Sequence, residues 1–321
     1  MIKRFSLRYK TDNDTGFGSQ SNNQGSRLIN ADGSYNVKHS GLPFLQRLNV
    51  FHELITLPTW KFNLLVFAAF IVLNCFFASL YLLVGMEQIE GDMGKTTLEQ
   101  FSDAFFFSAQ TLTTVGYGRQ NPVGLYANLI SAFECLVGLM SFALMTGLLY
   151  SRFSRPVAKL IFSEMLLIAP YQSKTGLMFR LANARKNHLI ECEVELLLTL
   201  NVQEDSQVMR KFYNLNLERS RINSLALSWT IVHPIDEQSP LHEVTVKDLI
   251  DGDAEFMFFF KAFDDTYSQH VHTRYSYKAS QIIENAEFIS MFNRSEDGTA
   301  TVLRLNEIST FEKINTLNIK E

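Results

Sequence analysis

Two long stretches of this chain carry almost no charge, and they limit the folds it can adopt more than any other feature. No charged residue lies within 62–86, and Glu134 is the only charged residue within 120–151. A membrane-spanning helix needs about 20 consecutive apolar residues. We therefore expect two spanning helices, over 62–86 and about 124–150.

The region between these spans adds a second constraint. Residues 101–113 are largely apolar but too short to cross a bilayer, and the sequence Thr-Val-Gly-Tyr-Gly follows at 114–118. Gly116 and Gly118 permit the positive φ that turns successive carbonyl groups to one side. Irregular backbone at membrane depth is tolerated only when it is buried in protein or lines a water-filled path. The sequence therefore predicts a re-entrant helix followed by a pore-lining loop.

Charged residues at the ends of the spans predict their orientation. Lys61 precedes the first span and Arg152, Arg155 and Lys159 follow the second, whereas acidic residues predominate within 87–100. Cytoplasmic flanks carry the excess of Lys and Arg. We expect both termini in the cytoplasm and the loop near the outer face.

Composition narrows the classes of function. The net charge of −4 argues against a nucleic-acid partner, and the three cysteines show neither metal-ligand spacing nor a disulfide framework. We find no phosphate-binding loop, metal-ligand cluster or nucleophile–base pair, so we expect no enzyme activity and no cofactor. Residues 1–26 lack a signal-peptide pattern and are polar enough to be disordered.

A short amphipathic segment precedes the first span. Within 43–58, apolar side chains recur at helical spacing, at Leu45, Leu48, Phe51, Leu54 and Ile55. This pattern is typical of a helix in the membrane interface. A helix packed on protein would show the same pattern, and the two interpretations are compatible.

From about Thr175 the hydrophobic pattern changes to period two. Within 188–201 the even positions from Ile190 to Leu200 are apolar and alternate with acidic residues, which predicts a half-buried strand. Further strands are expected over 176–183, 209–217, 227–233, 254–263, 269–277 and 301–305. Many short strands without long helices between them indicate a cytoplasmic β-sandwich.

Several segments together resemble the inward-rectifier potassium channels, and the prokaryotic (KirBac-type) branch in particular. They are 27–37, with Asp32-Gly33 as a turn, 110–122 around the loop, 153–156 after the second span, and 179–191 and 233–241 in the β region. The resemblance implies an α+β membrane protein with a two-helix pore, a re-entrant pore helix with a selectivity filter, and a cytoplasmic immunoglobulin-like β-sandwich. We expect a cytoplasmic arm over 1–42 with a strand region at 27–37, an interfacial slide helix over 43–58, a transmembrane pore domain over 59–153, and the sandwich over 154–321.

The loop is similar to the filter of potassium channels, whose carbonyl oxygens replace the hydration shell of K⁺. The coordinating residues are Thr114, Val115, Gly116, Tyr117 and Gly118. A filter needs four strands around one axis, so a C4 homotetramer is implied. No partner protein is evident. Potassium is the only metal expected, as the permeant ion.

Three residues are candidates for supporting the filter: Gln110, Thr113 and Glu134. Gln110 is a neutral amide where eukaryotic members of the family carry a Glu paired with a later Arg. Glu134 is an ionisable residue inside a span, which is a functional hypothesis by default. It could contact the pore helix or the filter, or remain in packing.

Positions on the second span suggest a gate. Phe142, Thr146 and Tyr150 are spaced four residues apart and share one helical face, which we expect to line the pore, with helix packing as the alternative. The resemblance implies that a Tyr150 ring narrows the inner end and that Phe142, lacking an acid, makes rectification weak. Gly138 and Gly147 are candidates for a hinge, and close helix packing explains them equally well.

Charged cytoplasmic residues provide two further hypotheses. By resemblance, Glu191 and Asp265 line a vestibule that attracts Mg²⁺ or polyamines as blockers, although a solvated strand face is the alternative. A basic cluster beside the membrane is a candidate site for anionic phospholipids, and it comprises Arg47, Lys61, Arg152, Arg155 and Lys159. Charges that only set the topology would look the same.

The sequence thus predicts a potassium-selective channel of a bacterial inner membrane, gated at the inner helices by the cytoplasmic domain and by anionic lipid. One rival is a non-conducting membrane receptor that senses a ligand through the β domain. The other is a cation channel without potassium selectivity. Intact Gly116 and Gly118 disfavour the first rival, and Val115 and Tyr117 disfavour the second.

Overall fold

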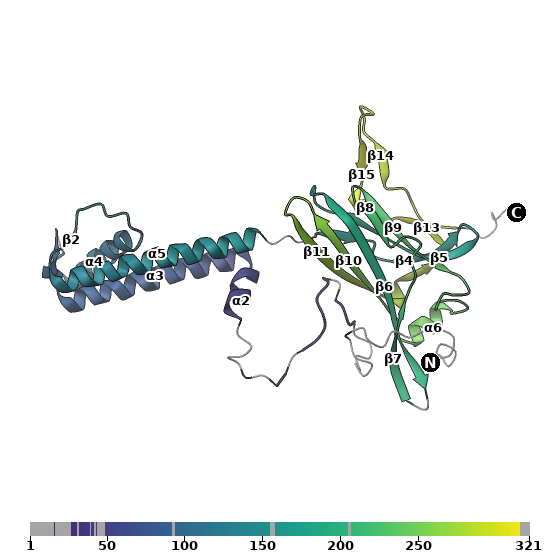
Figure 1. The fold of residues 1–321 in the computed structure, drawn as a ribbon, viewed down its shortest axis with the longest axis horizontal. Helices are drawn as coiled ribbons and strands as arrows, with labels where there is room; N and C mark the ends of the chain where they lie inside the picture. Colours follow the sequence, from purple (N-terminus) through teal and green to yellow (C-terminus); the bar gives the residue numbers. More distant parts are fainter. Residues whose placement is uncertain are drawn as a thin grey trace. The chain divides into compact units, whose positions relative to one another are not determined.

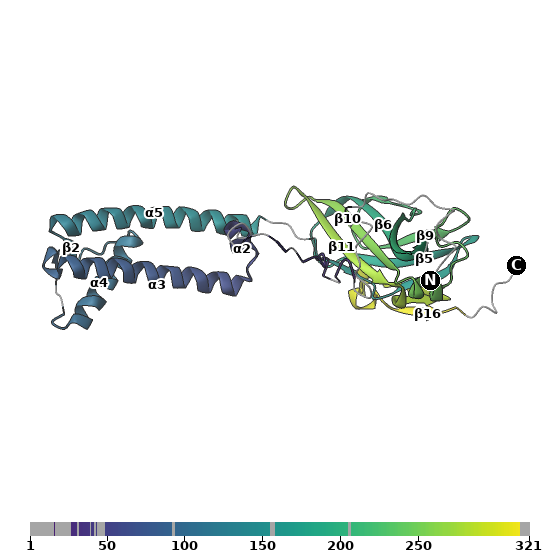
Figure 2. The same cartoon turned by 90° about the horizontal axis from the view of Figure 1, so that it is seen from below.

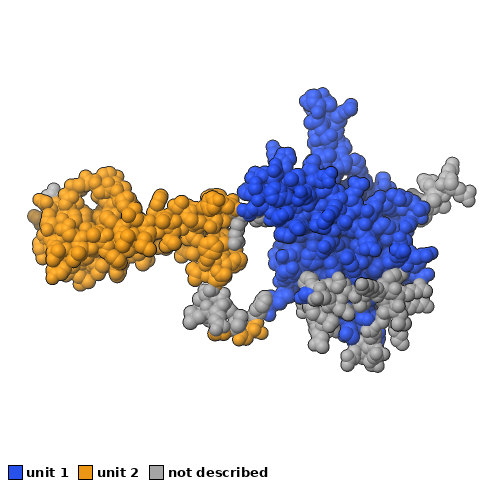
Figure 3. All heavy atoms as spheres, viewed as in Figure 1, with its two compact units in different colours: residues 1–39, 156–321 blue, residues 40–155 orange. Residues whose placement is uncertain are grey.

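The protein contains two compact units. The computed structural model describes residues 16, 27–30, 32–38, 40–41, 43, 49–91, 94–154, 158–204 and 207–314. One unit comprises residues 1–39 and 156–321, and the other comprises residues 40–155 (Figure 3).

Two long helices form most of the unit over 40–155. α3 covers Thr59–Val84 and α5 covers Leu125–Phe153, and both are long and apolar enough to cross a membrane. The shorter α4, Thr97–Leu112, packs against both of them. Figure 2 shows α3 and α5 side by side. These helices confirm the two predicted spans and the short helix between them.

Polar contacts define the start of α4 and the segment before it. The hydroxyl of Thr96 accepts from the amide of Glu99, and the Glu99 carboxylate accepts from the amide of Thr96, so the pair forms a capping box. Upstream, η1 (Met86–Gln88) leads into β1 (Ile89–Glu90), which pairs with β2 (Asn121–Pro122). The pairing of β1 with β2 therefore joins the chain before α4 to the chain after it.

The amphipathic segment before α3 forms a shorter helix than 43–58. α2 covers Val50–Thr56, and residues 44–48 lie outside the described part of the chain. α2 ends at Thr56 because Pro58 disfavours helical backbone at the preceding residue, Leu57, which has φ −53° and ψ 142°.

The other unit contains two five-stranded sheets (Figure 1). The first has the order β11-β10-β6-β7 with β8 also paired to β6, and the second has the order β12-β4-β5-β3 with β9 also paired to β5. All pairs are antiparallel except β12 with β4. The strands are β3 Leu160–Phe162, β4 Leu166–Tyr171, β5 Lys174–Asn183, β6 Leu189–Glu204, β7 Gln207–Asn214, β8 Arg221–Ser224, β9 Ser228–Ile235, β10 Glu255–Asp264, β11 Gln269–Lys278 and β12 Ile282–Glu284.

Apolar side chains from both sheets share one core. The rings of Phe179 on β5 and Phe258 on β10 meet edge to face at 5.2 Å, and both are fully buried. This packing confirms the predicted β-sandwich. Shorter elements complete the unit: α6 Val246–Asp251, η2 Ala279–Gln281, η3 Leu305–Glu307, and the pairs β13 Ala286–Phe288 with β16 Phe311–Lys313 and β14 Phe292–Arg294 with β15 Thr301–Leu303.

Some strands differ from the prediction. The expected strand 209–217 ends at Asn214, and the sequence did not predict β4. In β4, Leu166 packs in the main core while Leu167 packs in a second apolar cluster on the other face. Because both faces of this strand are covered, its sequence shows no alternation.

A β-bulge changes the phase of β6 near its start. Lys261 on β10 faces Glu193, but Phe263 faces Ile190, so one extra residue is inserted in β6. Glu191 takes φ +50° at this point. As a result Leu189 is fully buried and Ile190 only partly, whereas simple alternation predicted that Ile190 faces the core.

Candidate functional site

The loop after α4 has alternating backbone handedness. Within 114–118, φ is positive at Thr114 (59°), Gly116 (54°) and Gly118 (77°) and at no other position. This alternation turns successive carbonyl groups toward the same side, which regular helix or strand geometry does not allow. The positive φ expected at the two glycines is present. The third, at Thr114, was missed, because a β-branched residue is rarely found in this conformation.

The start of the loop is anchored to the last turn of α4. The carbonyl of Gln110 accepts from the amides of Val115 at 2.9 Å and Gly116 at 3.4 Å. The Thr113 hydroxyl donates to the carbonyl of Ala109 at 2.7 Å. Gln110 thus contacts the loop through its main chain, and Thr113 satisfies a carbonyl at the helix end.

The far end of the loop, at Gly118, is fixed by chain segments before and after α4. The Asn121 side chain donates to the carbonyl of Gly118 at 3.2 Å, and the amide of Val123 donates to the carbonyl of Gln88 at 2.8 Å. Side chains of 114–119 are exposed in the single chain. Hydrogen bonds therefore hold the backbone of the loop at both of its ends.

Glu134 on α5 lies beside α4 and is fully buried. Its carboxyl group hydrogen-bonds Ser108 of α4 and accepts from Tyr81 of α3. Among the described contacts, none joins the Glu134 side chain directly to residues 114–118.

The candidate gate residues lie exposed along α5. Phe142 and Tyr150 are 75% and 73% exposed in the single chain, and the Thr146 hydroxyl donates to the Phe142 carbonyl at 2.8 Å. The two candidate hinge glycines, Gly138 and Gly147, differ in how closely other atoms approach them. A Cβ at Gly138 would overlap the backbone carbonyl of Leu112, whereas a Cβ at Gly147 would meet nothing within 4 Å. The close packing of α4 on α5 therefore requires a glycine at position 138. No neighbouring atom in the described chain requires one at position 147.

Both parts of the chain match known families. Residues 29–156 match the inward rectifier potassium channel transmembrane domain, and residues 160–320 match the inward rectifier potassium channel C-terminal domain. The chain belongs to the inward rectifier potassium channel family. It is an integral membrane channel with two spanning helices. This membership confirms the expectation that it is not an enzyme.

Individual relatives support the same conclusion. The inward rectifier potassium channel Kirbac3.1 of Paramagnetospirillum magnetotacticum is 37% identical over 274 residues, covering 85% of this chain and 91% of the relative. The G protein-activated inward rectifier potassium channel 2 of Pongo abelii is 28% identical over 301 residues, covering 85% and 69%. Its counterpart from Mus musculus is 27% identical over 302 residues, covering 85% and 68%. The bacterial relative confirms the resemblance to the prokaryotic branch.

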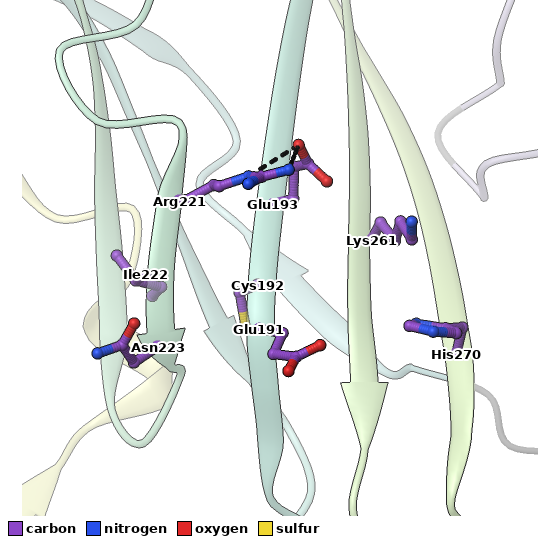
Figure 4. A pocket seen from close by; sticks show the side chains of 8 residues that line it. All are labelled: Glu191, Cys192, Glu193, Arg221, Ile222, Asn223, Lys261 and His270. Carbon is purple, nitrogen blue, oxygen red and sulfur yellow. Dashed lines mark hydrogen bonds and ion pairs between the residues drawn. The ribbon is translucent and has the colours of Figure 1, made fainter.

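The channel's predicted vestibule acids lie at one end of the first sheet. Glu191 occupies the bulge of β6, and Asp265 follows β10, where its amide donates to the carbonyl of His188 at 3.1 Å. A surface hollow of about 330 Å³ lies beside Glu191, lined by Glu191, Cys192, Glu193, Arg221, Ile222, Asn223, Lys261 and His270 (Figure 4).

Basic side chains balance the acids in this hollow. Arg221 bonds the Glu193 carboxylate at 2.7 Å, and Lys261 stands opposite Glu193 on the neighbouring strand. Figure 4 shows Lys261 on β10, the strand next to the one that carries Glu191, and His270 on β11, one strand further away. The sequence analysis missed Arg221 and Lys261, because strand pairing alone brings them beside the acids. The hollow therefore carries both signs of charge.

The basic residues proposed for lipid binding have different surroundings. The Arg152 guanidinium donates to the carbonyls of Leu54 at 2.8 Å and Leu57 at 2.9 Å, and it stacks over the Phe62 ring at 4.4 Å. Arg152 thus caps the end of α2. Lys61 and Lys159 are exposed. Arg47 and Arg155 lie outside the described residues.

The N-terminal segment is anchored on the sandwich by a buried carboxylate that sequence analysis missed. Glu255 at the start of β10 is fully buried and accepts from the amides of Leu28 at 2.8 Å and Ile29 at 3.1 Å. Arg210 lies 3.5 Å from the same carboxylate and compensates its charge. An acid at the start of a largely apolar strand, Ala254–Phe263, was the signal available. The two amides that it binds are more than 200 residues away in sequence.

His233 joins two loops of the sandwich. It is 2% exposed, and its Nδ1 lies 2.6 Å from the carbonyl of Asn216 while Nε2 lies 2.8 Å from the hydroxyl of Ser239. Because a carbonyl only accepts, Nδ1 carries the hydrogen and Nε2 accepts from Ser239. Burial lowers the pKa of His233.

This pKa shift predicts how stability depends on pH. An unfolded His titrates at about pH 6.5. Because folded His233 binds its proton less readily, its contribution to the free energy of unfolding is complete above about pH 6.5 and is lost as the pH falls below it. We expect His233→Gln to reduce this loss. The measurement is urea unfolding of the full chain between about pH 8 and 5, followed by Trp229 fluorescence in a Trp60→Phe background.

His242→Gln is the matched control, because His242 is only partly buried. It should keep the pH dependence of the parent. An unchanged pH dependence in the His233→Gln protein would contradict the assignment.

Proposed function

We propose that four copies of this chain assemble around a common axis as a potassium-selective channel through which K⁺ moves passively. The observation that carries the proposal is the alternating φ of residues 114–118, held at both ends by hydrogen bonds. One chain supplies one strand of carbonyls, so complete coordination of an ion requires four chains. Channels of this family are tetramers.

The inner half of α5 is the proposed gate. Four Tyr150 rings around the axis would narrow the path and exclude water. The cytoplasmic unit controls the gate through residues 154–159. Gly147 is the proposed hinge, because no contact among the described residues requires a glycine there. Gly138 has a packing role in this proposal. The termini are cytoplasmic and the membrane is the bacterial inner membrane.

Rectification should be weak for two reasons. Phe142 places an apolar ring where a carboxylate would bind a blocking cation inside the pore. The surface around Glu191 also carries Lys261 and Arg221, which reduce the local attraction for Mg²⁺ or polyamines.

Anionic phospholipid is the proposed ligand of the basic residues beside the membrane. Lys61 and Lys159 are exposed and have the charge for this role. Arg152 takes part indirectly in this proposal, because two of its donors already hold the end of α2 against α5. A headgroup that attracts the guanidinium would change that contact.

Uptake of radioactive Rb⁺ into liposomes tests the proposed function. We expect Ba²⁺-sensitive uptake that K⁺ suppresses and Na⁺ does not. Gly116→Ala should abolish it, because a Cβ strains backbone at φ +54° and displaces the carbonyls. Gly298→Ala is the matched control, with φ +68° in an exposed turn of the cytoplasmic unit.

Uptake that Na⁺ suppresses as well as K⁺ would contradict the proposal in favour of a non-selective cation channel. Tetramers that show no uptake in any lipid mixture, even with Tyr150→Ala, would favour the non-conducting receptor.

The gate predicts a second result in the same assay. Tyr150→Ala should raise the initial rate of Rb⁺ uptake by about tenfold, the effect of shifting a closed-to-open equilibrium by about 1.4 kcal/mol. Competition by K⁺ and Na⁺ should stay unchanged. Leu144→Ala is the control, because Leu144 is 68% exposed and lies on the opposite face of α5. Equal rates in the two variants would place the gate elsewhere.

A further inference from the structure

A polar cluster lies inside the apolar helices of the unit over 40–155. It consists of Asn74 and Tyr81 from α3, Ser108 from α4 and Glu134 from α5, each at most 1% exposed. Polar side chains buried among apolar helices are unfavourable unless they bond to one another. A cluster that draws on all three helices therefore constrains how those helices can lie.

Hydrogen bonds connect the four side chains in series. The Tyr81 hydroxyl donates to Glu134 Oε2 at 2.6 Å, and Ser108 Oγ hydrogen-bonds Glu134 Oε1. Ser108 Oγ also lies 3.0 Å from Asn74 Oδ1, and the Asn74 amide donates to the carbonyl of Phe70 at 2.7 Å. Both carboxyl oxygens of Glu134 are thus engaged, one by each neighbouring helix.

Ser108 occupies the centre of this series. Its single hydroxyl hydrogen faces two oxygens, Asn74 Oδ1 and Glu134 Oε1, and can fully serve only one of them. An amide at position 134 would donate to Ser108 and still accept from Tyr81. Gln is therefore expected to fit this cluster at least as well as Glu.

The cluster is close to the part of α4 that holds the filter. Ser108 precedes Gln110 by two residues, and the Gln110 carbonyl accepts from the amides of Val115 and Gly116. One turn beyond Glu134, Gly138 lies against the carbonyl of Leu112 at the end of α4. α4 thus contacts α5 at two positions, through the hydrogen bond between Ser108 and Glu134 and through the close approach of Gly138 to the Leu112 carbonyl.

We propose that Glu134 is a positioning residue for ion selection. Through Ser108 and Tyr81 it fixes the depth and rotation of α4 between the spanning helices, and so sets the spacing of the filter carbonyls. This inference rests on the proposed potassium filter. A purely structural role in packing would instead affect assembly without altering the preference for K⁺ over Na⁺.

Ion-dependent stability of the tetramer tests the inference even if the gate is shut. An ion that binds only the folded filter raises the thermal midpoint of the tetramer according to its concentration. We expect Ser108→Ala and Glu134→Ala to raise the K⁺ concentration that gives half-maximal stabilisation by about tenfold, as expected for a lost hydrogen bond to a buried carboxyl group. The difference between the half-stabilising concentrations of K⁺ and Na⁺ should become smaller. Glu134→Gln should retain the wild-type values.

Ser79→Ala is the matched control. Its hydroxyl is on α3 but is exposed and donates only to the carbonyl of Cys75 in its own helix. The K⁺ and Na⁺ concentrations that half-stabilise this variant should equal those of the wild type.

Each outcome decides a different point. Ser108→Ala and Tyr81→Phe tetramers with wild-type K⁺ and Na⁺ values would overturn the inference, even if Glu134→Ala fails to assemble. Loss of K⁺ preference in the Glu134→Gln tetramer would show that a Gln amide, donating to Ser108 and accepting from Tyr81, cannot replace the Glu134 carboxyl group. A wild-type tetramer that K⁺ does not stabilise would instead overturn the potassium filter itself.

Discussion

Unpaired backbone at membrane depth is the constraint on which this structure depends. Irregular backbone is tolerated there only where it is buried in protein or lines a water-filled path, so each amide and carbonyl of residues 113–118 needs a partner or a function. The amides of Thr114, Val115 and Gly116 bond the end of α4, and the carbonyl of Gly118 accepts from Asn121. In the proposed channel, the remaining carbonyls of this loop coordinate the ion. The contacts of α4 with the loop, and the pairing of β1 with β2, hold the loop on both sides.

The helical unit and the β-sandwich use buried polar groups in the same manner. Glu134 links three apolar helices, and Glu255 binds the amides of the N-terminal segment on the sandwich. Arg152, which is only partly buried, likewise links the end of α2 to α5. Each group is costly to bury alone and is stable only with its partners in place. Such contacts specify one arrangement of segments that apolar packing alone would leave loosely defined.

Features encoded by neighbouring residues could be predicted from the sequence, and those that depend on tertiary contact could not. The spanning helices follow from uncharged runs, and the positive φ at two positions of the loop follows from Gly116 and Gly118. The partners of Glu134 lie 26 and 53 residues away, so its role stayed open. The bulge at Glu191 and the position of Lys261 beside the acids depend on strand pairing, which the alternation of residues does not reveal.

We propose that carbonyls of residues 114–118 from four chains bind K⁺ on a common axis. Crystals of the tetramer grown in Rb⁺ would reveal this binding, because Rb⁺ substitutes for K⁺ and its anomalous scattering shows its position. We expect a row of Rb⁺ peaks on the fourfold axis between rings of these carbonyls. An ordered tetramer whose loops enclose no Rb⁺ on that axis would contradict it.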